Sequence, residues 1–249
     1  SMSQEIQEVE SEIAVNFTNI IEAAVPAIDY RVIMVARHGR YQDQRVCIPE
    51  PLGGAADANM DGHCDTIPNV PMNGERFNAL CRLYQEFYPA DRHGLNPNGY
   101  QDRLRDDAFK VFVVITDDRV HTNQQNGCSS PLFNDQNTVA GGEAVATGWD
   151  DAMLTLSPEH FGTAENRNYV FHSIIGLAPY DNADFALPHP PEAPIISNRC
   201  TPGSENPGTG YQGLSVLSEG LRYPSCGLDY TPIFQRIAPA TPLMRYSSS

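Results

Sequence analysis

Near the middle of the chain the sequence runs Val111-Phe112-Val113-Val114-Ile115-Thr116-Asp117-Asp118. The apolar run at its start predicts a strand buried on both faces, because strands of parallel sheets read as continuous apolar stretches. Two acids follow directly after that run. We therefore expect this strand to present carboxylates at the carboxyl edge of a parallel sheet, where open α/β folds bind their ligands.

Helices and strands alternate on both sides of this strand. Further strands are expected over residues 31–36 and 169–175, and helices over residues 4–24, 77–88, 141–156, 211–221 and 232–237. This alternation predicts an α/β fold with a doubly wound, mostly parallel sheet flanked by helices. We expect one domain over residues 1–238, with long insertions over about 37–76 and 179–207, and a disordered tail over residues 239–249.

The chain is strongly acidic. Its 249 residues include 16 basic and 31 acidic side chains, which gives a formal net charge of -15. Such a charge repels nucleic-acid phosphates and anionic lipid surfaces, so no nucleic-acid partner is expected and cations are the natural small partners. No stretch approaches the roughly 20 apolar residues of a membrane-spanning helix, so no membrane insertion is expected either.

The six cysteines are spread along the chain without a C-x-x-C spacing, which disfavours a zinc site. An even number in an acidic chain rich in proline and glycine favours disulfides formed in an oxidising compartment, and six buried free thiols are the alternative. Six cysteines allow fifteen connectivities. Sequence order predicts the pairs Cys47 with Cys64, Cys200 with Cys226, and Cys81 with Cys128.

Several motifs carry a resemblance to a known family. They are Ser1-Met2-Ser3-Gln4-Glu5-Ile6, the strand over residues 30–36, Val113-Val114-Ile115-Thr116-Asp117-Asp118 and the helix that contains Gly210-Tyr211-Gln212. Together they resemble von Willebrand factor type A domains of bacterial surface and secreted proteins, over about residues 1–238. The resemblance implies a Rossmann-like fold and a secreted or cell-surface binding domain. Such a domain recognises a protein or extracellular-matrix ligand and is not an enzyme.

In that family a divalent cation, magnesium or calcium, is held by an Asp-x-Ser-x-Ser loop after the first strand, by a threonine and by a distant aspartate. By resemblance, Ser1 is the last serine of that loop, so the match lacks the family's first strand. Asp117 corresponds to the distant aspartate. Residues 73–78, where the family has its threonine, offer Arg76 and no hydroxyl. The resemblance thus implies a cation at Ser1 and Asp117 that accepts a carboxylate from a partner.

Residues 57–65 carry a second sequence pattern that is typical of a cation site. Oxygen-bearing side chains alternate along this loop, and Gly62 permits a sharp turn, as in the first part of a calcium loop. The twelfth position is Pro68 and not the bidentate glutamate of an EF-hand, so the loop is closer to the calcium-binding repeats of extracellular proteins. A solvated acidic loop pinned by Cys64 is the alternative. The expected calcium ligands are Asp57, Asn59, Asp61 and Asp65.

Two other functions compete with binding through a cation. Arg37-His38-Gly39 follows a predicted strand, as in histidine phosphatases, which use the histidine as phosphoryl acceptor and arginines to grip phosphate. A late histidine followed by an acid, which those enzymes also carry, is missing, and so is the Gly-x-Ser-x-Gly elbow of serine hydrolases. A metal-free structural module of a larger surface assembly would share the fold without a competent cation site.

Overall fold

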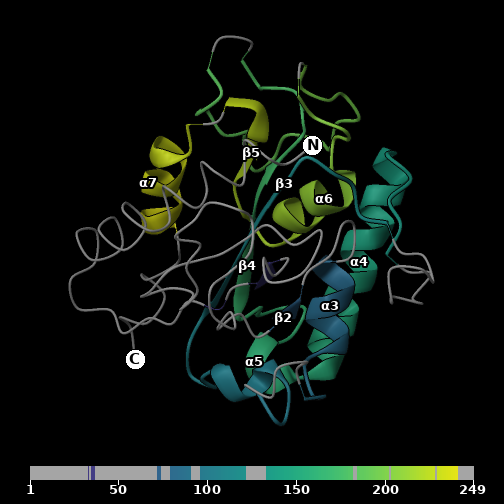
Figure 1. The fold of residues 1–249 in the computed structure, drawn as a ribbon, viewed down its shortest axis with the longest axis vertical. Helices are drawn as coiled ribbons and strands as arrows, with labels where there is room; N and C mark the ends of the chain where they lie inside the picture. Colours follow the sequence, from purple (N-terminus) through teal and green to yellow (C-terminus); the bar gives the residue numbers. More distant parts are fainter. Residues whose placement is uncertain are drawn as a thin grey trace, which may run out of the picture.

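The structure is a computed structural model that describes residues 33, 35–36, 72–73, 79–90, 96–121, 133–181, 184–201, 203–227 and 229–240 (Figure 1). Its elements are β1 (Val35–Ala36), β2 (Met72–Asn73), α3 (Ala79–Gln85), the 3-10 helix η2 (Tyr100–Arg103), β3 (Lys110–Thr116), α4 (Val139–Leu156), α5 (Pro158–Phe161), β4 (Tyr169–Ile175), α6 (Thr209–Leu217), β5 (Arg222–Pro224), the 3-10 helix η4 (Ser225–Gly227) and α7 (Thr231–Ala240). The predicted α/β class is confirmed, because parallel strands alternate with helices along the chain.

Parallel pairing organises the described strands. β3, β4 and β5 form one sheet in that order, with Lys110 opposite Tyr169 and Ser173 opposite Arg222. Every residue of the central strand β4 is buried, as expected for a strand covered on both faces. β1 and β2 form a separate parallel pair, in which Val35 lies opposite Met72.

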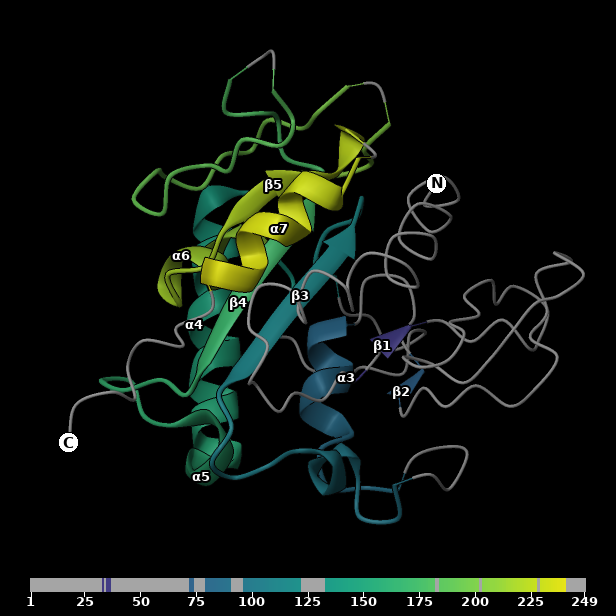
Figure 2. The ribbon, with the colours of Figure 1, turned by 90° about the vertical axis from the view of Figure 1, so that its left-hand side faces the viewer.

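Helices cover both faces of the three-stranded sheet, with α4 and α6 on one side and α7 on the other (Figures 1 and 2). The side chains of the strands alternate accordingly. Phe112 and Phe171 belong to the core under α4 and α6, whereas Ile174 and Tyr223 belong to the core under α7. Each face of the sheet therefore has its own apolar core.

Helices α4 and α6 approach each other closely through small residues. A Cβ built on Gly213 of α6 would lie 2.7 Å from the carbonyl oxygen of Gly142 and 2.8 Å from the Cβ of Ala146, both in α4. A Cβ on Gly142 would lie 2.5 Å from the carbonyl oxygen of Thr209. These distances leave no room for a side chain. The close packing brings the first turns of α4 and α6 together beside the carboxyl edge of the sheet.

Strands β3 and β4 and helices α3, α4 and α7 lie where the sequence predicts them. Helix α6, expected to reach residue 221, ends earlier, at Leu217. Beyond the helix end, Glu219 has a positive φ of 60°, and a Cβ on Gly220 would lie 1.9 Å from the carbonyl oxygen of Phe171 in β4. The chain leaves the helix there and forms β5, which the sequence analysis did not predict.

Other expectations concern the ends of the chain. Helix α7 extends to Ala240, past the predicted domain boundary at residue 238. The helix expected over residues 4–24 and most of the insertion over residues 37–76 lie outside the described residues. Among the helices that the structure describes, none is long and apolar enough to cross a membrane.

A disulfide joins Cys200 to Cys226, which confirms one of the predicted pairs. Cys81 is also disulfide-bonded, and its partner lies outside the described residues. No described cysteine is a free thiol. Disulfides form and persist in oxidising compartments, so this finding is consistent with the predicted extracytoplasmic location.

Candidate functional site

The carboxyl edge of the sheet gathers acidic and amide side chains. β3 ends at Thr116, and the next residues, Asp117 and Asp118, have exposed fractions of only 1% and 8%. The amide of Asp118 donates to the hydroxyl of Thr116 at 3.1 Å, which turns the chain at the end of the strand. Because β3 and β4 run parallel, these acids lie at the predicted carboxyl edge.

The loop before α6 holds Asp117 through its backbone. The carbonyl oxygen of Asp117 accepts hydrogen bonds from the amides of Glu205 at 3.1 Å and Asn206 at 2.9 Å. Residues 205–206 belong to the segment between β4 and α6, so these bonds connect the end of β3 to the loop that leads into α6. The main chain thus sets where the Asp117 carboxylate lies.

Two amide side chains form a hydrogen-bonded row that begins at Asp118. Asn206 donates from Nδ2 to Oδ1 of Asp118 at 3.0 Å, and Asn137 donates from Nδ2 to Oδ1 of Asn206 at 2.6 Å. A carboxylate only accepts, so Asn206 turns its amino group toward Asp118 and its oxygen toward Asn137. The other polar atom of the Asn137 side chain is Oδ1. That oxygen is buried and has no hydrogen-bond partner among the described residues.

Asp135 is the residue at this edge that the sequence analysis missed. It is fully buried, and its carboxylate accepts three backbone amides, from Val120 at 3.2 Å, Asn137 at 3.0 Å and Gly210 at 3.0 Å. Gly210 lies in the first turn of α6 and Asn137 just before α4, so the charge lies where both helix dipoles favour an anion. The available signal was the run over residues 134–138, which holds helix-capping residue types before a predicted helix.

The insertion over residues 179–207 is held by a buried arginine. Arg222 of β5 has no exposed surface, and its guanidinium donates to the carbonyls of Pro190 at 2.8 Å, Ala193 at 2.7 Å and Pro194 at 3.3 Å. Burial lowers the pKa of Arg222 to about 10, against an opposing effect of the Glu192 carboxylate, so the guanidinium stays charged at neutral pH. One side chain thus organises a proline-rich segment whose described residues form no helix or strand.

A buried glutamine and the disulfide hold the same insertion. The amide oxygen of Gln212 accepts from the amide of Ile196 at 3.0 Å, and its nitrogen donates to the carbonyls of Ile196 at 2.8 Å and Pro207 at 2.9 Å. The disulfide ties Cys200 to Cys226, next to β5. Figure 2 shows β3 pointing toward the end of the molecule that this insertion occupies. The insertion therefore borders the carboxyl edge on a fixed framework.

A serine, a histidine and an aspartate meet at the opposite end of the sheet. Ser157 Oγ lies 2.7 Å from His160 Nδ1, and His160 Nε2 lies 3.2 Å from Asp106 Oδ1. Burial and the nearby Lys110 ammonium lower the pKa of His160, although Asp106 acts in the opposite direction. Ser157 and His160 are both buried and lie on one turn around the start of α5. We interpret these three side chains as a structural contact between α5 and the turn before β3, not as a hydrolase site.

Most of the predicted site residues lie outside the described part of the chain. This holds for Ser1, for the calcium-loop positions Asp57, Asn59, Asp61 and Asp65, and for the motif over residues 37–39. Within the described residues, no group of three or more histidine, cysteine, aspartate or glutamate side chains is arranged to hold a metal ion. Of the predicted ligands, the structure places Asp117 alone, and it adds Asp118, Asn137 and Asn206 beside it.

Comparisons of this chain with family models, with curated proteins and with solved structures give no match. The resemblance to von Willebrand factor type A domains therefore stays a prediction that rests on the quoted motifs.

Proposed function

We propose that this chain is an extracytoplasmic binding domain of the von Willebrand factor type A kind. It recognises a protein or matrix ligand through a divalent cation held at the carboxyl edge near Asp117. The observation that carries the proposal is the buried, backbone-anchored position of Asp117 directly after β3, with Asp118 beside it. Open α/β sheets bind ligands at this edge, and buried carboxylates there suit a cation.

The residues at this edge fit a hard cation. The side chains identified there carry oxygen donors, and Oδ1 of Asn137 is buried without a hydrogen-bond partner among the described residues. Magnesium and calcium prefer oxygen ligands, and magnesium keeps several waters while taking few protein groups. Asp117 and Asp118 would hold the ion, together with Ser1 as the resemblance implies. The bound ion supplies a coordination position for a carboxylate of the partner.

The setting of the site agrees with an extracytoplasmic role. The net charge of -15 attracts cations, and the Cys200–Cys226 disulfide suits an oxidising compartment. Calcium ordering of the loop over residues 57–65 is a second part of the proposal. It rests on the alternating ligands Asp57, Asn59, Asp61 and Asp65 in the sequence.

Thermal unfolding in chelator, in magnesium and in calcium tests the proposal. A cation that binds only the folded state stabilises it by about 2.7 kcal/mol at 100 times its Kd, which raises Tm by several degrees. We expect a magnesium-dependent rise that Asp117→Asn removes and Asp151→Asn keeps, since Asp151 is an exposed acid on α4. A calcium-specific rise that Asp61→Ala removes would support the local loop.

Three results would contradict the proposal. No shift of Tm with either ion would leave the metal-free structural module as the better function. Turnover of a generic phosphate ester by the chain, lost in His38→Ala, would establish the phosphatase alternative instead. Equal loss of the magnesium effect in Asp117→Asn and Asp151→Asn would show that the ion binds through general surface charge.

A further inference from the structure

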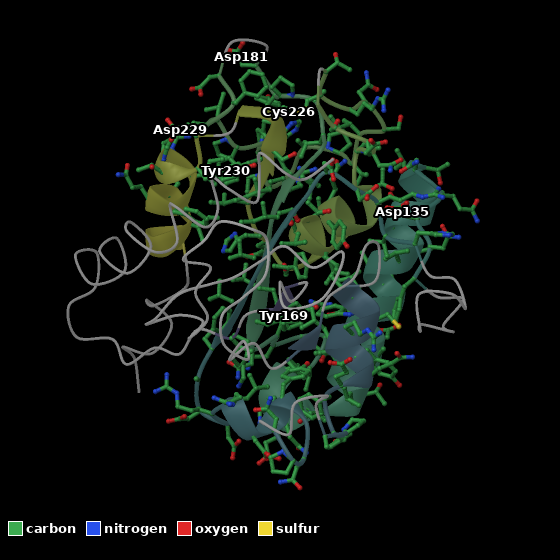
Figure 3. All side chains as sticks on the ribbon, viewed as in Figure 1. Asp135, Tyr169, Asp181, Cys226, Asp229 and Tyr230 are labelled. Carbon is green, nitrogen blue, oxygen red and sulfur yellow. A yellow bond between two sulfur atoms is a disulfide. The ribbon has the colours of Figure 1, made fainter. Side chains whose placement is uncertain are left out.

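Strand β3 lies at one side of its sheet. Among the described strands it pairs with β4 alone, and β1 and β2 form a separate pair. We refer to the side of β3 that faces away from β4, over residues 110–116, as the open edge. Lys110 lies opposite Tyr169, so the open edge begins near the residue labelled Tyr169 in Figure 3 and runs toward the end of the molecule that holds Cys226.

The hydrogen bonds of β3 to β4 show which backbone groups the open edge presents. The amide of Lys110 donates to the carbonyl of Asn168 at 3.0 Å, so it points toward β4. Successive amides of a strand point to opposite edges, so every second residue after Lys110 also bonds toward β4. The residues between them present their amides and carbonyls at the open edge, and these are Val111, Val113 and Ile115.

The open edge is accessible along the strand. Every residue of β4 is buried, whereas in β3 all residues after Lys110 are at least partly exposed, and Val111 has an exposed fraction of 38%. Proteins usually protect such an edge with charged residues, with proline or with a bulge. Residues 111–115 are all apolar and pair with β4 in unbroken register, so none of these devices protects the open edge.

Helix α3 extends the layer of helices past the open edge. The indole of Trp149 in α4 donates to the carbonyl of Leu80 in α3 at 2.9 Å, and Leu80 belongs to the same core as Phe112 of β3. Figure 2 shows α3 on the side of β3 that faces away from β4, and Figure 1 shows α3 on the same face of the sheet as α4. A strand added at the open edge would therefore have one face against α3.

The position of α3 also indicates what kind of partner fits. Two copies of the chain would pair their β3 strands about a twofold axis perpendicular to the sheet. Each α3 would then project over β3 of the other copy, on the face that the helices of that copy already cover. Both copies would also carry a net charge of -15, which opposes their association. A single extended segment meets neither obstacle.

We infer that the open edge binds an extended segment of a partner protein that carries apolar side chains at alternate positions. The backbone of this segment bonds to the amides and carbonyls of Val111, Val113 and Ile115 and continues the sheet by one strand. Side chains of a strand alternate between its two faces, so every second side chain of the segment contacts α3 and must be apolar. This contact goes beyond the proposed cation site and does not need the cation.

Amide hydrogen exchange followed by NMR, in chelator, tests the inference. In the free chain the amides of Phe112 and Val114 should be protected, because they point toward β4, whereas those of Val111, Val113 and Ile115 should exchange without protection. The probe is a peptide of alternating valine and threonine with lysines at both ends, which keep it in solution. Its addition should protect the three outward amides. A control peptide with two adjacent prolines at its centre lacks an amide on either edge and should not protect them.

Two variants change the open edge in different ways. Val113→Pro removes an outward amide while β3 keeps its bonds to β4, and it should weaken peptide binding about 10-fold. Val111→Lys adds a charge beside the bound segment and should weaken binding about 2- to 5-fold. The matched control is Val139→Lys at the start of α4, where the valine has an exposed fraction of 39%, and binding should not change. Circular dichroism checks that each variant is folded.

Four outcomes would overturn the inference. Protection of all five amides in the free chain would show that the open edge is already covered. Equal binding of the proline control peptide, or a loss in Val139→Lys as large as in Val111→Lys, would show that the peptide binds elsewhere. Dimerisation of the free chain that Val113→Pro abolishes would assign the edge to a second copy. Because the assay contains chelator, its failure is independent of the proposed cation site, which is tested separately by the magnesium effect on Tm.

Discussion

Oδ2 of Asp135 accepts a hydrogen bond from the backbone amide of Gly210 at 3.0 Å, so a residue ahead of α4 caps the first turn of α6. Helix α6 needs this cap, because the residue before it, Gly208, has a left-handed conformation and offers no side chain. The same carboxylate also binds the amides of Val120 and Asn137. Asp135 thereby joins the three segments that form the carboxyl edge.

Asp135→Asn should destabilise the fold by about 2–3 kcal/mol, because hydrogen bonds to a charged acceptor contribute about 1.5–3 kcal/mol. Asparagine has one acceptor oxygen in place of two, so at least one of the three amides would face an amino group. Urea unfolding measures the effect. Asp151→Asn, at an exposed position on α4, should change the free energy of unfolding by less than about 0.5 kcal/mol. A similarly small change in the free energy of unfolding of Asp135→Asn would show that Asp135 contributes little to the stability of this edge.

Gly213→Ala should also destabilise the chain, although alanine is the better helix former by up to about 1 kcal/mol. The new Cβ would meet the carbonyl oxygen of Gly142 and the Cβ of Ala146, and overpacking of this kind costs about 1–3 kcal/mol. Chemical denaturation compares this variant with Thr147→Ala, an exposed change on α4 that should be neutral or slightly stabilising. Gain of stability in Gly213→Ala would mean that α4 and α6 can move apart freely.

The elements that could be predicted from the sequence are those set by a pattern of neighbouring residues. β3 and β4 are apolar runs bounded by polar residues, and α4 follows a run of capping residue types, so their positions depend little on the rest of the chain. β5 could not be predicted, because it is short, begins with Arg222 and ends with Pro224. Only its pairing with the end of β4 makes it a strand, and that pairing joins residues far apart in sequence.

The residues of the candidate site also differ in how far the sequence alone predicts them. Asp117 was predictable because an acid directly after an apolar parallel strand must lie at the carboxyl edge. The role of Asp135 was not, because its hydrogen bond to Gly210 spans 75 residues and appears only once α4 and α6 are packed. The row from Asp118 through Asn206 to Asn137 likewise depends on three separate loops.

His172 should make the stability of the chain depend on pH. Burial lowers the pKa of His172 from 6.5 to about 4, and its Nδ1 accepts from the amide of Leu221 at 3.0 Å. Between these pH values the unfolded chain binds a proton that the folded chain does not, so stability falls as the pH is lowered. The contribution is complete above pH 6.5 and is lost toward pH 4, with a total of about 3 kcal/mol.

Urea unfolding between pH 7 and pH 4 compares the wild type with His172→Gln, which keeps an acceptor for Leu221 but does not titrate. We expect the free energy of unfolding to fall less steeply with acid in the variant. The other histidines and the carboxylates contribute to both curves, so the difference between the slopes isolates His172. Parallel curves, or an NMR titration that finds a pKa near 6.5 for His172, would contradict the prediction.

Arg222→Lys should loosen the proline-rich insertion although it keeps the positive charge. A lysine ammonium cannot reach all three carbonyls that the planar guanidinium binds, and buried carbonyls left without donors cost about 1–3 kcal/mol each. Hydrogen exchange should show the loss locally. The amide of His189 donates to the carbonyl of Arg222 at 2.9 Å and should exchange faster in the variant.

The matched control for this change is Arg199→Lys. Arg199 also donates to backbone carbonyls, of Ser204 and Glu205, but it is exposed, so water can replace those bonds at little cost. The free energy of unfolding should therefore fall in Arg222→Lys and change by less than about 0.5 kcal/mol in Arg199→Lys. Equal effects would show that the burial of the guanidinium does not determine how firmly the insertion is held.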